Sequence, residues 1–420
     1  MVPRGKKLVV GKCDISDFFY RFRIPRWMLP YFALPGILAD DIGMQYIYGS
    51  GVMVYPCLAV LAMGWSHSVF LTQNIHEYFL DTKTTYLHAD NRITPTSDLY
   101  VDRLRHIVYV DDLILLGTDS KQVLLAQHEY INNANAADLL IKDTKVRWPT
   151  ADGLDCLGLE VHGDECIVSP RADKLERLRM DTINLLRIGS CTGDSLAQLV
   201  GRWTWVMLIV RPALACFNSV YRFIKCAGRK LFRIWPSVSN ELWMIARLSP
   251  LFMVHMSSTT FPETFATDAS MSGQGIVSAS ISPTLVELAA RSSGIVTPKN
   301  DNDTVIDDQL LNHKWKTLVA APWKYGEEHI NQLEIISIAT GVRRLLSTPY
   351  SIRRRVLFLS DSQVAVAILS KGRTSSYKLL RRVRSISALL LASGIQLFLR
   401  WIPSLKNPAD GPSRLYEHKQ

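Results

Sequence analysis

The sequence has few cysteines, no cysteine pair with metal-ligand spacing and no long apolar run. Its seven cysteines are an odd number without a CxxC pair, which argues against a disulfide framework or a cysteine zinc site. We interpret them as reduced thiols of an intracellular protein, cytoplasmic or nuclear. The longest apolar stretch, 203–216, is interrupted by Arg211 and Pro212 and is too short and too charged to span a membrane. No signal peptide is apparent, since residues 1–7 lead directly into a strand-like segment.

Basic residues outnumber acidic ones, which gives a formal charge of +10 and a pI of about 9.2. Such a balance attracts phosphates through counterion release but carries no information about base sequence. A basic soluble protein without a nucleic-acid partner fits the charge alone equally well. The basic residues gather at 171–187, 222–233 and 373–384. Aromatic residues are interleaved with the first two stretches, as on a surface that stacks bases along a phosphate backbone.

The chain of 420 residues, 48% of them hydrophobic, is long enough for two or three globular domains. Apolar periodicity in the first part predicts strands at 8–14 and 157–161, a hairpin at 106–117, and helices at 64–80 and 124–140. Further along, it predicts helices at 171–186, 193–223, 330–346 and 362–369, and strands at 265–268, 356–359 and 396–401. The polar segment 291–310 is expected to be an exposed insertion.

Two adjacent acids, Asp111 and Asp112, separate the apolar strands of the predicted hairpin. Their charges repel, and an unpaired buried carboxylate is costly, so a bound Mg²⁺ would relieve both effects. A solvated turn that happens to hold two acids is the alternative. Asp14 ends the first predicted strand. If the two strands are neighbours, Asp14 and Asp111 face each other and can hold two metal ions about 4 Å apart.

Five stretches of the sequence carry recognisable motifs in a fixed order. The runs CDISDFFYRF and YVDDLILLG resemble the palm motifs that carry the metal-binding aspartates of reverse transcriptases. The run LAMGWSHSVFLTQ is similar to the motif that packs against the template and the nascent base pair. AADLLIKDTK resembles the segment with a lysine near the triphosphate, and LDCLGLEV resembles the primer-grip hairpin. Five motifs in order are far more specific than any single one.

The resemblance implies a role for each matching residue. Asp14 and Asp111 would be metal ligands, and Asp112 would complete the acidic cluster around two Mg²⁺ or Mn²⁺ ions. Phe19 falls where the family keeps a bulky ring that sterically excludes a 2′-hydroxyl, although simple core packing is the alternative. The other residues implied to lie near dNTP, template or primer are Asp17, Phe18, Gly64, Gln73, Lys145, Leu157 and Gly158.

One departure from the family concerns the N-terminal side of this region. Only 13 residues precede Asp14, where family members have their fingers subdomain. We therefore expect the fingers to be largely absent from this chain. It would then be a fragment, a decayed copy or one reading frame of a split element.

A second set of acids lies within 261–420, each beside a predicted strand end, helix start or turn: Asp268, Glu334, Asp361 and Asp410. Their order resembles the catalytic set of the ribonuclease H fold, which implies two further Mg²⁺ ions that activate water. The phrases HINQLE, SDSQVAVAILSKG and WIPSLKNPADGPSR are particularly similar to those of DIRS-like (tyrosine-recombinase) retrotransposons. Four solvated acids at turns are the alternative.

The resemblance implies three regions. An α+β polymerase palm covers 1–168, a helical thumb and connection covers 169–260, and an α/β ribonuclease H-like domain covers 261–420. A basic helix beside the second acidic set would face the RNA–DNA hybrid, although a solvated charged face is an equal alternative. Its implied contact residues are Arg373, Lys378, Arg381 and Arg382.

Two functions follow as hypotheses. The first is an RNA-directed DNA polymerase with ribonuclease H activity, acting on an RNA template, a DNA primer, dNTPs and the resulting hybrid. The second is a nucleic-acid-binding remnant without polymerase activity, which retains ribonuclease H activity or lacks it as well. The sequence leaves the oligomeric state open and predicts no membrane partner.

Overall fold

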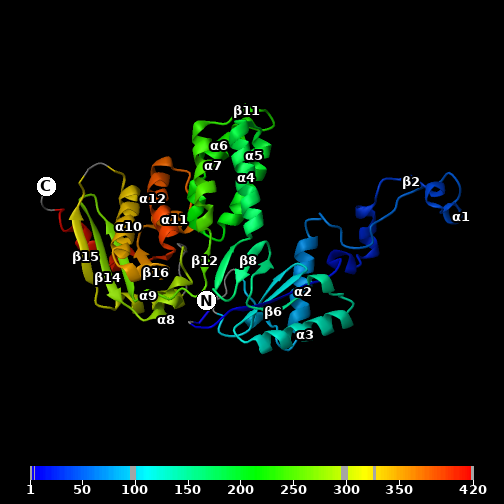
Figure 1. Cartoon of the computed structure of the whole chain (residues 1–420), viewed down its shortest axis with the longest axis horizontal. Helices are drawn as coiled ribbons and strands as arrows, with labels where there is room; N and C mark the ends of the chain where they lie inside the picture. The colour runs from blue at the N-terminus through cyan, green and yellow to red at the C-terminus, as the bar shows by residue number, and fades with distance from the viewer. Residues whose placement is uncertain (1, 4, 95–100, 295–300, 325–327, 418–420) are drawn as a thin grey trace. The chain divides into compact units, whose positions relative to one another are not determined.

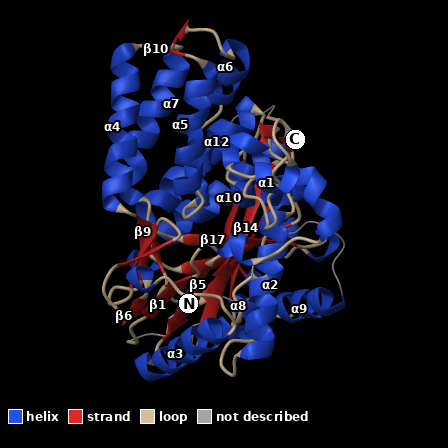
Figure 2. Cartoon of the chain, turned by 90° about the vertical axis from the view of Figure 1, so that its right-hand side faces the viewer, coloured by secondary structure: helices blue, strands red, loops and turns tan. Residues whose placement is uncertain are grey.

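The computed structural model describes residues 2–3, 5–94, 101–294, 301–324 and 328–417. The chain forms two compact units: Met1–Cys156 with Val161–Asp164, and Leu157–Glu160 with Glu165–Gln420. Figure 1 shows the order of their elements along the chain, and both units combine helices with sheets (Figure 2). Among the described residues, no helix is both long and apolar enough to cross a membrane.

The first unit is built on an antiparallel sheet in the order β4-β5-β1-β6. Its strands are β1 (Val9–Asp14), β4 (Arg105–Tyr109), β5 (Asp112–Gly117) and β6 (Arg147–Thr150). The apolar strand residues Cys13, Leu113 and Leu115 form a buried core with Tyr130, which comes from helix α3 (Ser120–Ala136). The predicted first strand and the predicted hairpin are therefore neighbours in this sheet.

Two predicted helices of this unit have shifted bounds for local reasons. Helix α2 (Ser68–Lys83) begins four residues later than predicted, because Gly64 has a φ of 93°, which is not helical. Helix α3 begins and ends four residues earlier than predicted. Asp119 caps it by accepting a hydrogen bond from the Lys121 N–H at 2.9 Å, which satisfies one of the free donors of the first turn.

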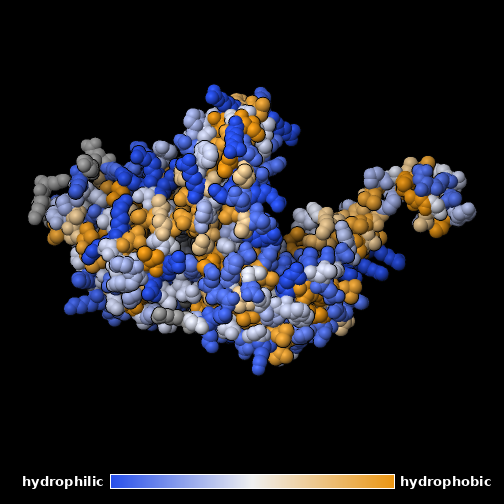
Figure 3. All heavy atoms as spheres, in the orientation of Figure 1, coloured by the Kyte–Doolittle hydropathy of each residue, from blue (hydrophilic) through white to orange (hydrophobic). Residues whose placement is uncertain are grey.

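A segment at 26–54 has an outer part, with β2 and α1, that projects from the rest of the first unit in Figure 1. It contains only short elements: η2 (Arg26–Phe32), β2 (Ile37–Leu38), η3 (Ala39–Ile42), α1 (Gln45–Tyr48) and β3 (Met53–Val54). Many of its large apolar side chains are exposed, among them Leu34, Ile47 and Met53, and Figure 3 shows hydrophobic residues on the surface of this segment. The core of the unit is formed mostly by residues outside this segment.

The boundary between the units falls at two short strands, β7 (Leu154–Cys156) and β8 (Leu159–His162). The prediction of a strand over 157–161 is wrong in its first two residues. Leu157 and Gly158 have φ values of 53° and 83°, a left-handed conformation that cannot continue a strand. These two residues form the turn between β7 and β8.

In the second unit, two strands that pair with each other lie before and after a group of helices in the chain. Strand β9 (Ile167–Pro170) pairs with β12 (Val254–His255). The helices are α4 (Ala172–Ile188), α5 (Gly193–Met207), α6 (Ser219–Ala227) and α7 (Pro236–Leu248). The prediction of one helix over 193–223 is wrong: α5 ends at Met207, and a 3-10 helix, η6 (Arg211–Cys216), precedes α6. Pro212 explains the break, since proline cannot donate a helical hydrogen bond.

A five-stranded sheet in the order β15-β14-β13-β16-β17 follows. Strands β13, β16 and β17 are parallel, whereas β14 and β15 are antiparallel to their neighbours. The strands are β13 (Glu263–Ala269), β14 (Gly273–Ser280), β15 (Lys316–Pro322), β16 (Arg355–Ser360) and β17 (Gln396–Trp401). The remaining helices described below are α8 (Pro283–Ala290), α9 (Asp301–Leu311), α10 (Ile330–Leu346), α11 (Gln363–Lys371), α12 (Tyr377–Ser393) and α13 (Asp410–Arg414).

Alternating residues of the central strands are buried on both faces of this sheet. Phe265 and Phe358 pack into one core together with α10 and α12. Ala266 and Leu357 pack into another core, with residues of α8 and α9. Burial of both faces is the usual state of parallel strands, and it fixes the ends of β13 and β16 in place.

The prediction of an exposed insertion over 291–310 is wrong in part: residues such as Val305 are exposed, but Asp307 and Leu310 are buried. Residues 295–300 of this segment lie outside the described residues. Helix α9 lies against the sheet through the buried Leu310. Arg400 of β17 is fully buried and donates to Asp307 at 2.7 Å and to Asp303 at 3.2 Å. The same guanidinium donates to the Ala289 carbonyl at 3.0 Å. An arginine distant in sequence therefore draws the polar segment onto the sheet.

Removing this guanidinium would leave the Asp307 and Asp303 carboxylates in a buried place without their main partner. We expect Arg400→Met to lower the free energy of unfolding by about 3–5 kcal/mol, the usual cost of breaking a buried ion pair. Denaturant unfolding followed by circular dichroism measures this loss. The exposed Lys314 provides the control Lys314→Met, and equal midpoints for the two variants would contradict the role given to Arg400.

Candidate functional site

The parallel pairing of β13 and β16 brings two acids together at the ends of the strands. Thr267 is paired with Ser360, so Asp268 and Asp361 are the next residues on the two neighbouring chains. Glu334 reaches them from helix α10, and carboxylate oxygens of the three residues lie within 4.8 Å of one another. The structure thus gathers three of the four acids predicted for this region.

Burial makes the charged forms of these acids unfavourable. Asp268 and Glu334 are 4% and 7% exposed. Burial and the nearby charges of Asp268 and Asp361 raise the pKa of Glu334 to about 9. Burial raises the pKa of Asp268 to about 6, although a hydrogen bond from Ser413 opposes the shift. The cause is the desolvation of carboxylates placed close to one another.

A divalent cation fits these residues. Within the described part of the chain, Glu334 Oε2 is buried and has no hydrogen-bond partner. Oxygen ligands from several carboxylates are what Mg²⁺ and Mn²⁺ prefer. A cation at this place would compensate both the repulsion and the unpaired oxygen.

Sequence analysis missed three side chains that donate hydrogen bonds to the acids or to the backbone beside them. Asn407 donates to Asp361 Oδ1 at 3.2 Å and to the Thr267 carbonyl at 3.1 Å. The Ser413 hydroxyl donates to Asp268 Oδ2, and Trp401 Nε1 donates to the Asp361 carbonyl at 3.0 Å. All three lie in the run WIPSLKNPADGPSR, which the resemblance marked as a whole.

Asp410, the fourth predicted acid, is not one of the three clustered residues. It lies at the start of α13 and accepts a hydrogen bond from Arg414 Nε at 2.8 Å. Its charge still contributes to the raised pKa of Asp268. Helix α13 can approach the sheet because Gly275 has no side chain: a Cβ there would lie 2.3 Å from the Ala409 carbonyl oxygen.

In the first unit, the sheet places its three acids at one end of β1. Asp14 is paired with Asp112 across β1 and β5, and Asp111 occupies the turn before β5. The Ile15 N–H donates to the Asp111 carbonyl at 3.0 Å. Burial is the main cause of the raised pKa of Asp111, and the charges of Asp14 and Asp112 add to it. The predicted proximity of Asp14 to the Asp111–Asp112 pair is therefore present.

Two lysines offset part of this negative charge. Lys145 Nζ lies 2.5 Å from Asp14 Oδ2, and Lys12 Nζ lies 2.9 Å from Asp112 Oδ1. Sequence analysis placed Lys145 near a triphosphate, and in this structure its ammonium group contacts a predicted metal ligand. Among the described residues, only the cluster of the second unit brings three ligand atoms within 4.8 Å.

The aromatic residues after Asp14 differ in burial. Phe18 is buried, with its ring centroid 5.0 Å from that of Phe22 and 5.5 Å from that of His76. Phe19 is partly buried against the same core. Asp17 is exposed and has a φ of 52°. That Asp17 and Phe18 lie near an incoming dNTP stays a prediction.

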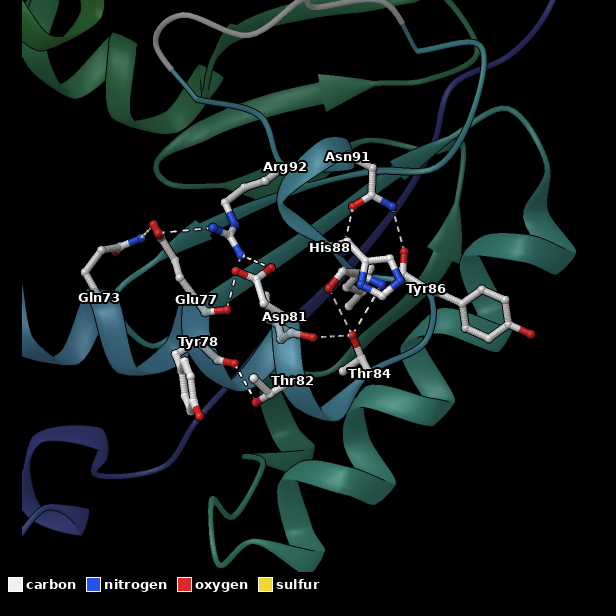
Figure 4. A network of polar contacts seen from close by, with 12 residues as sticks. Gln73, Glu77, Tyr78, Asp81, Thr82, Thr84, Tyr86, His88, Asn91 and Arg92 are labelled. Carbon is white, nitrogen blue, oxygen red and sulfur yellow. Dashed lines mark hydrogen bonds and ion pairs between the residues drawn. The ribbon is translucent and has the colours of Figure 1, made fainter.

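Gln73 contacts the backbone next to Asp111. Its Oε1 accepts from the Val110 N–H at 2.8 Å, and its Nε2 donates to the Val108 carbonyl at 3.2 Å. Nε2 also donates to Glu77 Oε1 at 2.7 Å (Figure 4). Gly64, predicted for the same nucleotide-facing motif, is exposed before α2.

The turn predicted as the primer grip belongs to the second unit. Leu157 and Gly158 precede β8 there, and a Cβ on Gly158 would lie 3.6 Å from Lys174 Nζ. A lysine therefore lies close to the backbone of this turn.

The predicted basic helix is α12, and it borders a cavity of about 600 Å³ together with α10. Lys378, Arg381, Arg382 and Arg343 line this cavity, and Arg382 is paired with Glu328. Arg373 is exposed in the loop before α12 and does not line it. Three of the four predicted basic residues thus share one concave surface.

No protein-family model and no curated protein matches this chain. Three solved structures of a foamy viral protease–reverse transcriptase are similar to it. In complex with double-stranded DNA, the form designated dRH has a TM-score of 0.44 at 11% identity, covering 94% of this chain and 57% of its own. A second double-stranded DNA complex has a TM-score of 0.43 at 12% identity, with 94% and 68% covered. The complex with an RNA/DNA hybrid has a TM-score of 0.39 at 12% identity, with 98% and 67% covered.

The raised pKa of Glu334 gives a prediction about pH. Below about pH 4.5 this group is protonated in both the folded and the unfolded chain. Between that value and its folded pKa of about 9, only the unfolded chain loses the proton, so the stability of the second unit falls as pH rises. We expect the thermal midpoint measured in EDTA to fall between pH 5 and 9, and to fall less in Glu334→Gln.

Mg²⁺ should reverse this trend, since it binds the ionised carboxylates. We expect added Mg²⁺ to raise the midpoint more at pH 8.5 than at pH 5.5 in the wild type, and much less in Glu334→Gln. The exposed Glu417 provides the control Glu417→Gln, which should behave as the wild type. If Mg²⁺ raised the midpoints of Glu334→Gln and Glu417→Gln equally, Glu334 would be excluded as a ligand.

Proposed function

We propose that this chain is the palm, thumb or connection, and ribonuclease H portion of a retrotransposon reverse transcriptase, with motifs closest to DIRS-like elements. It copies RNA into DNA and hydrolyses the RNA strand of the hybrid. The observation that carries this proposal is the cluster of Asp268, Glu334 and Asp361 within 4.8 Å. Two buried carboxylates, those of Asp268 and Glu334, lie beside the half-buried Asp361, and this arrangement is costly unless a divalent cation binds it.

The proposed hydrolytic site is that of the second unit. Asp268, Glu334 and Asp361 are the proposed ligands of two metal ions. Asp410, at the start of α13, is the proposed fourth ligand. The two ions would activate a water molecule and stabilise the leaving oxygen of a phosphodiester. Asn407 and Ser413 keep the Asp361 and Asp268 carboxylates oriented by donating to one oxygen of each.

The proposed polymerase site is that of the first unit. Asp14 and Asp111 hold the metal, with Asp112 beside them, and the Phe19 ring excludes a ribose 2′-hydroxyl. Lys145, whose ammonium group pairs with Asp14 at this end of the sheet, is the proposed partner of an incoming triphosphate. Gly64, Leu157 and Gly158 keep the template- and primer-facing roles implied by the sequence.

A second candidate is ribonuclease H activity without polymerisation. It is favoured by the pairing of Asp14 with Lys145 and of Asp112 with Lys12, because these ammonium groups compete with a metal for the same oxygens. In the second unit, Asp268 and Asp361 accept from the neutral Ser413 and Asn407, and the ion pair with Arg414 involves Asp410, which lies outside the cluster of three acids.

Substitution of one acid in each unit separates the two activities. We expect Asp111→Asn to abolish extension of a labelled DNA primer on an RNA template with dNTPs and Mg²⁺, and to leave cleavage of hybrid RNA intact. Asp361→Asn should have the opposite effect. Both results are expected because each aspartate is a proposed ligand only of the metal ions in its own unit.

The wild type decides between the candidates. Primer extension that Asp111→Asn removes supports the polymerase, whereas hybrid cleavage without extension supports the second candidate. Loss of both activities in either variant would contradict two separate sites. Hybrid cleavage retained in Asp361→Asn would remove that residue from the hydrolytic site.

The basic cavity beside α12 gives a prediction about hybrid binding. We expect the double variant Lys378→Ala/Arg381→Ala to bind an RNA–DNA hybrid more weakly, and the salt dependence of log Kd to become shallower by about one per lost phosphate contact. Fluorescence anisotropy with a labelled hybrid measures both. Arg229→Ala removes a basic side chain that is 95% exposed elsewhere in this unit, and an equal effect of this control would show that only net charge matters.

A further inference from the structure

Val110, the residue immediately before Asp111, has an unusual backbone conformation. Its φ is 54°, in the left-handed region that a β-branched residue rarely adopts because its side chain clashes with the backbone. Such a conformation persists only where surrounding contacts enforce it. Val110 is itself buried, so these contacts come from the core of the first unit.

Two side chains of helix α2, one turn apart, hold the two backbone groups of Val110. Gln73 Oε1 accepts from its N–H at 2.8 Å, and His76 Nδ1 lies 2.7 Å from its carbonyl oxygen. A helix places residues three apart on the same face. Together these bonds fix the peptide planes on both sides of Val110.

The partners of His76 determine its protonation. A carbonyl oxygen can only accept, so Nδ1 carries the proton that it donates to Val110. Nε2 then accepts a hydrogen bond, and the Tyr130 hydroxyl lies 2.9 Å from it. His76 and Tyr130 are both fully buried, and burial lowers the pKa of His76 to about 4. The ring is therefore neutral, with one defined tautomer.

Gln73 is held by a second set of contacts (Figure 4). Glu77 accepts from Gln73 Nε2 at 2.7 Å and from Arg92 Nη1 at 3.2 Å. Arg92 also donates to Asp81 at 2.6 Å. Each group that holds Val110 thus has a partner that fixes its own orientation.

We propose that His76, oriented by Tyr130, is a positioning residue for Asp111. The bond from His76 ends on the carbonyl of the peptide that joins Val110 to Asp111. If Val110 relaxed to a negative φ, this peptide would rotate and move the Asp111 carboxylate away from Asp14. This positioning role of His76 rests on the proposed polymerase function. His76 would orient the Asp111 carboxylate and would not itself contact the substrate.

Substitutions of His76 test this role. The amide nitrogen of asparagine can take the place of Nδ1, whereas leucine fills similar space without a donor. We expect His76→Leu to lower kcat of primer extension by roughly 10–100-fold, the effect of a small misplacement of a reacting group, with a much smaller change in KM for dNTP. His76→Asn should restore most of the activity, and Tyr130→Phe should cause an intermediate loss.

Two controls separate positioning from folding. Hybrid cleavage by the second unit should be unchanged in all three variants, and Tyr78→Phe, at an exposed tyrosine of the same helix, should leave extension unchanged. A His76→Leu enzyme with normal kcat would overturn the positioning role. An equal loss in His76→Asn and His76→Leu would overturn it too, because the donor would then not matter.

The tautomer is a readout that does not depend on activity. Ring ¹⁵N chemical shifts should show a protonated Nδ1 and an unprotonated Nε2 for His76, and Tyr130→Phe should move the Nε2 signal. The opposite tautomer would overturn the inference whether or not the chain polymerises. Absence of primer extension in the wild type, with the expected tautomer, would count against the proposed polymerase and not against the contact.

Discussion

The repulsion between carboxylates that share a buried place is the constraint on which both candidate sites depend. In the first unit, Lys145 and Lys12 offset it by pairing with Asp14 and Asp112. In the second unit, Asp268 and Asp361 accept from the neutral Ser413 and Asn407, and the pKa of Glu334 rises to about 9. Neutral donors orient a carboxylate without reducing the net charge, so the second unit retains the stronger demand for a cation. The two units thus stabilise their neighbouring carboxylates differently, the first with lysine ammonium groups and the second with neutral hydrogen-bond donors.

Carboxylates that repel one another stay close together only where the rest of the fold keeps them in place. The ends of β13 and β16 are fixed because both faces of the sheet are covered. The rings of Phe265 and Phe358 stack with centroids 4.9 Å apart on one face, and helices α8 and α9 contribute to the core on the other. Arg400 secures that second layer through its ion pairs with α9. A buried arginine of β17, the strand paired with β16, therefore supports the strands that hold the acids.

Sequence analysis could single out the acids because most of them lie at or near the end of an element with a clear local pattern. The predicted bounds of α10 and β17 agree with the structure, and Asp14 lies beside the predicted hairpin. The wrong predictions have non-local or conformational causes. Periodicity could not show that Leu157 adopts a positive φ. The break before η6 was missed for another reason, because apolar spacing was followed through Pro212, a residue that cannot donate a helical hydrogen bond. The acidic helix α9 looked solvent-exposed because its partner, Arg400, lies 93 residues further along the chain than Asp307.

The residues that orient the acids were the least predictable part of both sites, and for one common reason. Ser413 acts on Asp268 across 145 residues, and His76 acts on Val110 across 34. A carboxylate at a strand end can be recognised from its own neighbours in sequence. A histidine on the buried face of a helix has the pattern of ordinary core packing, and only the folded chain shows which backbone group it contacts. Since a metal ligand must point in one direction to act, the chemistry of each site depends on residues that carry no local signal of their role.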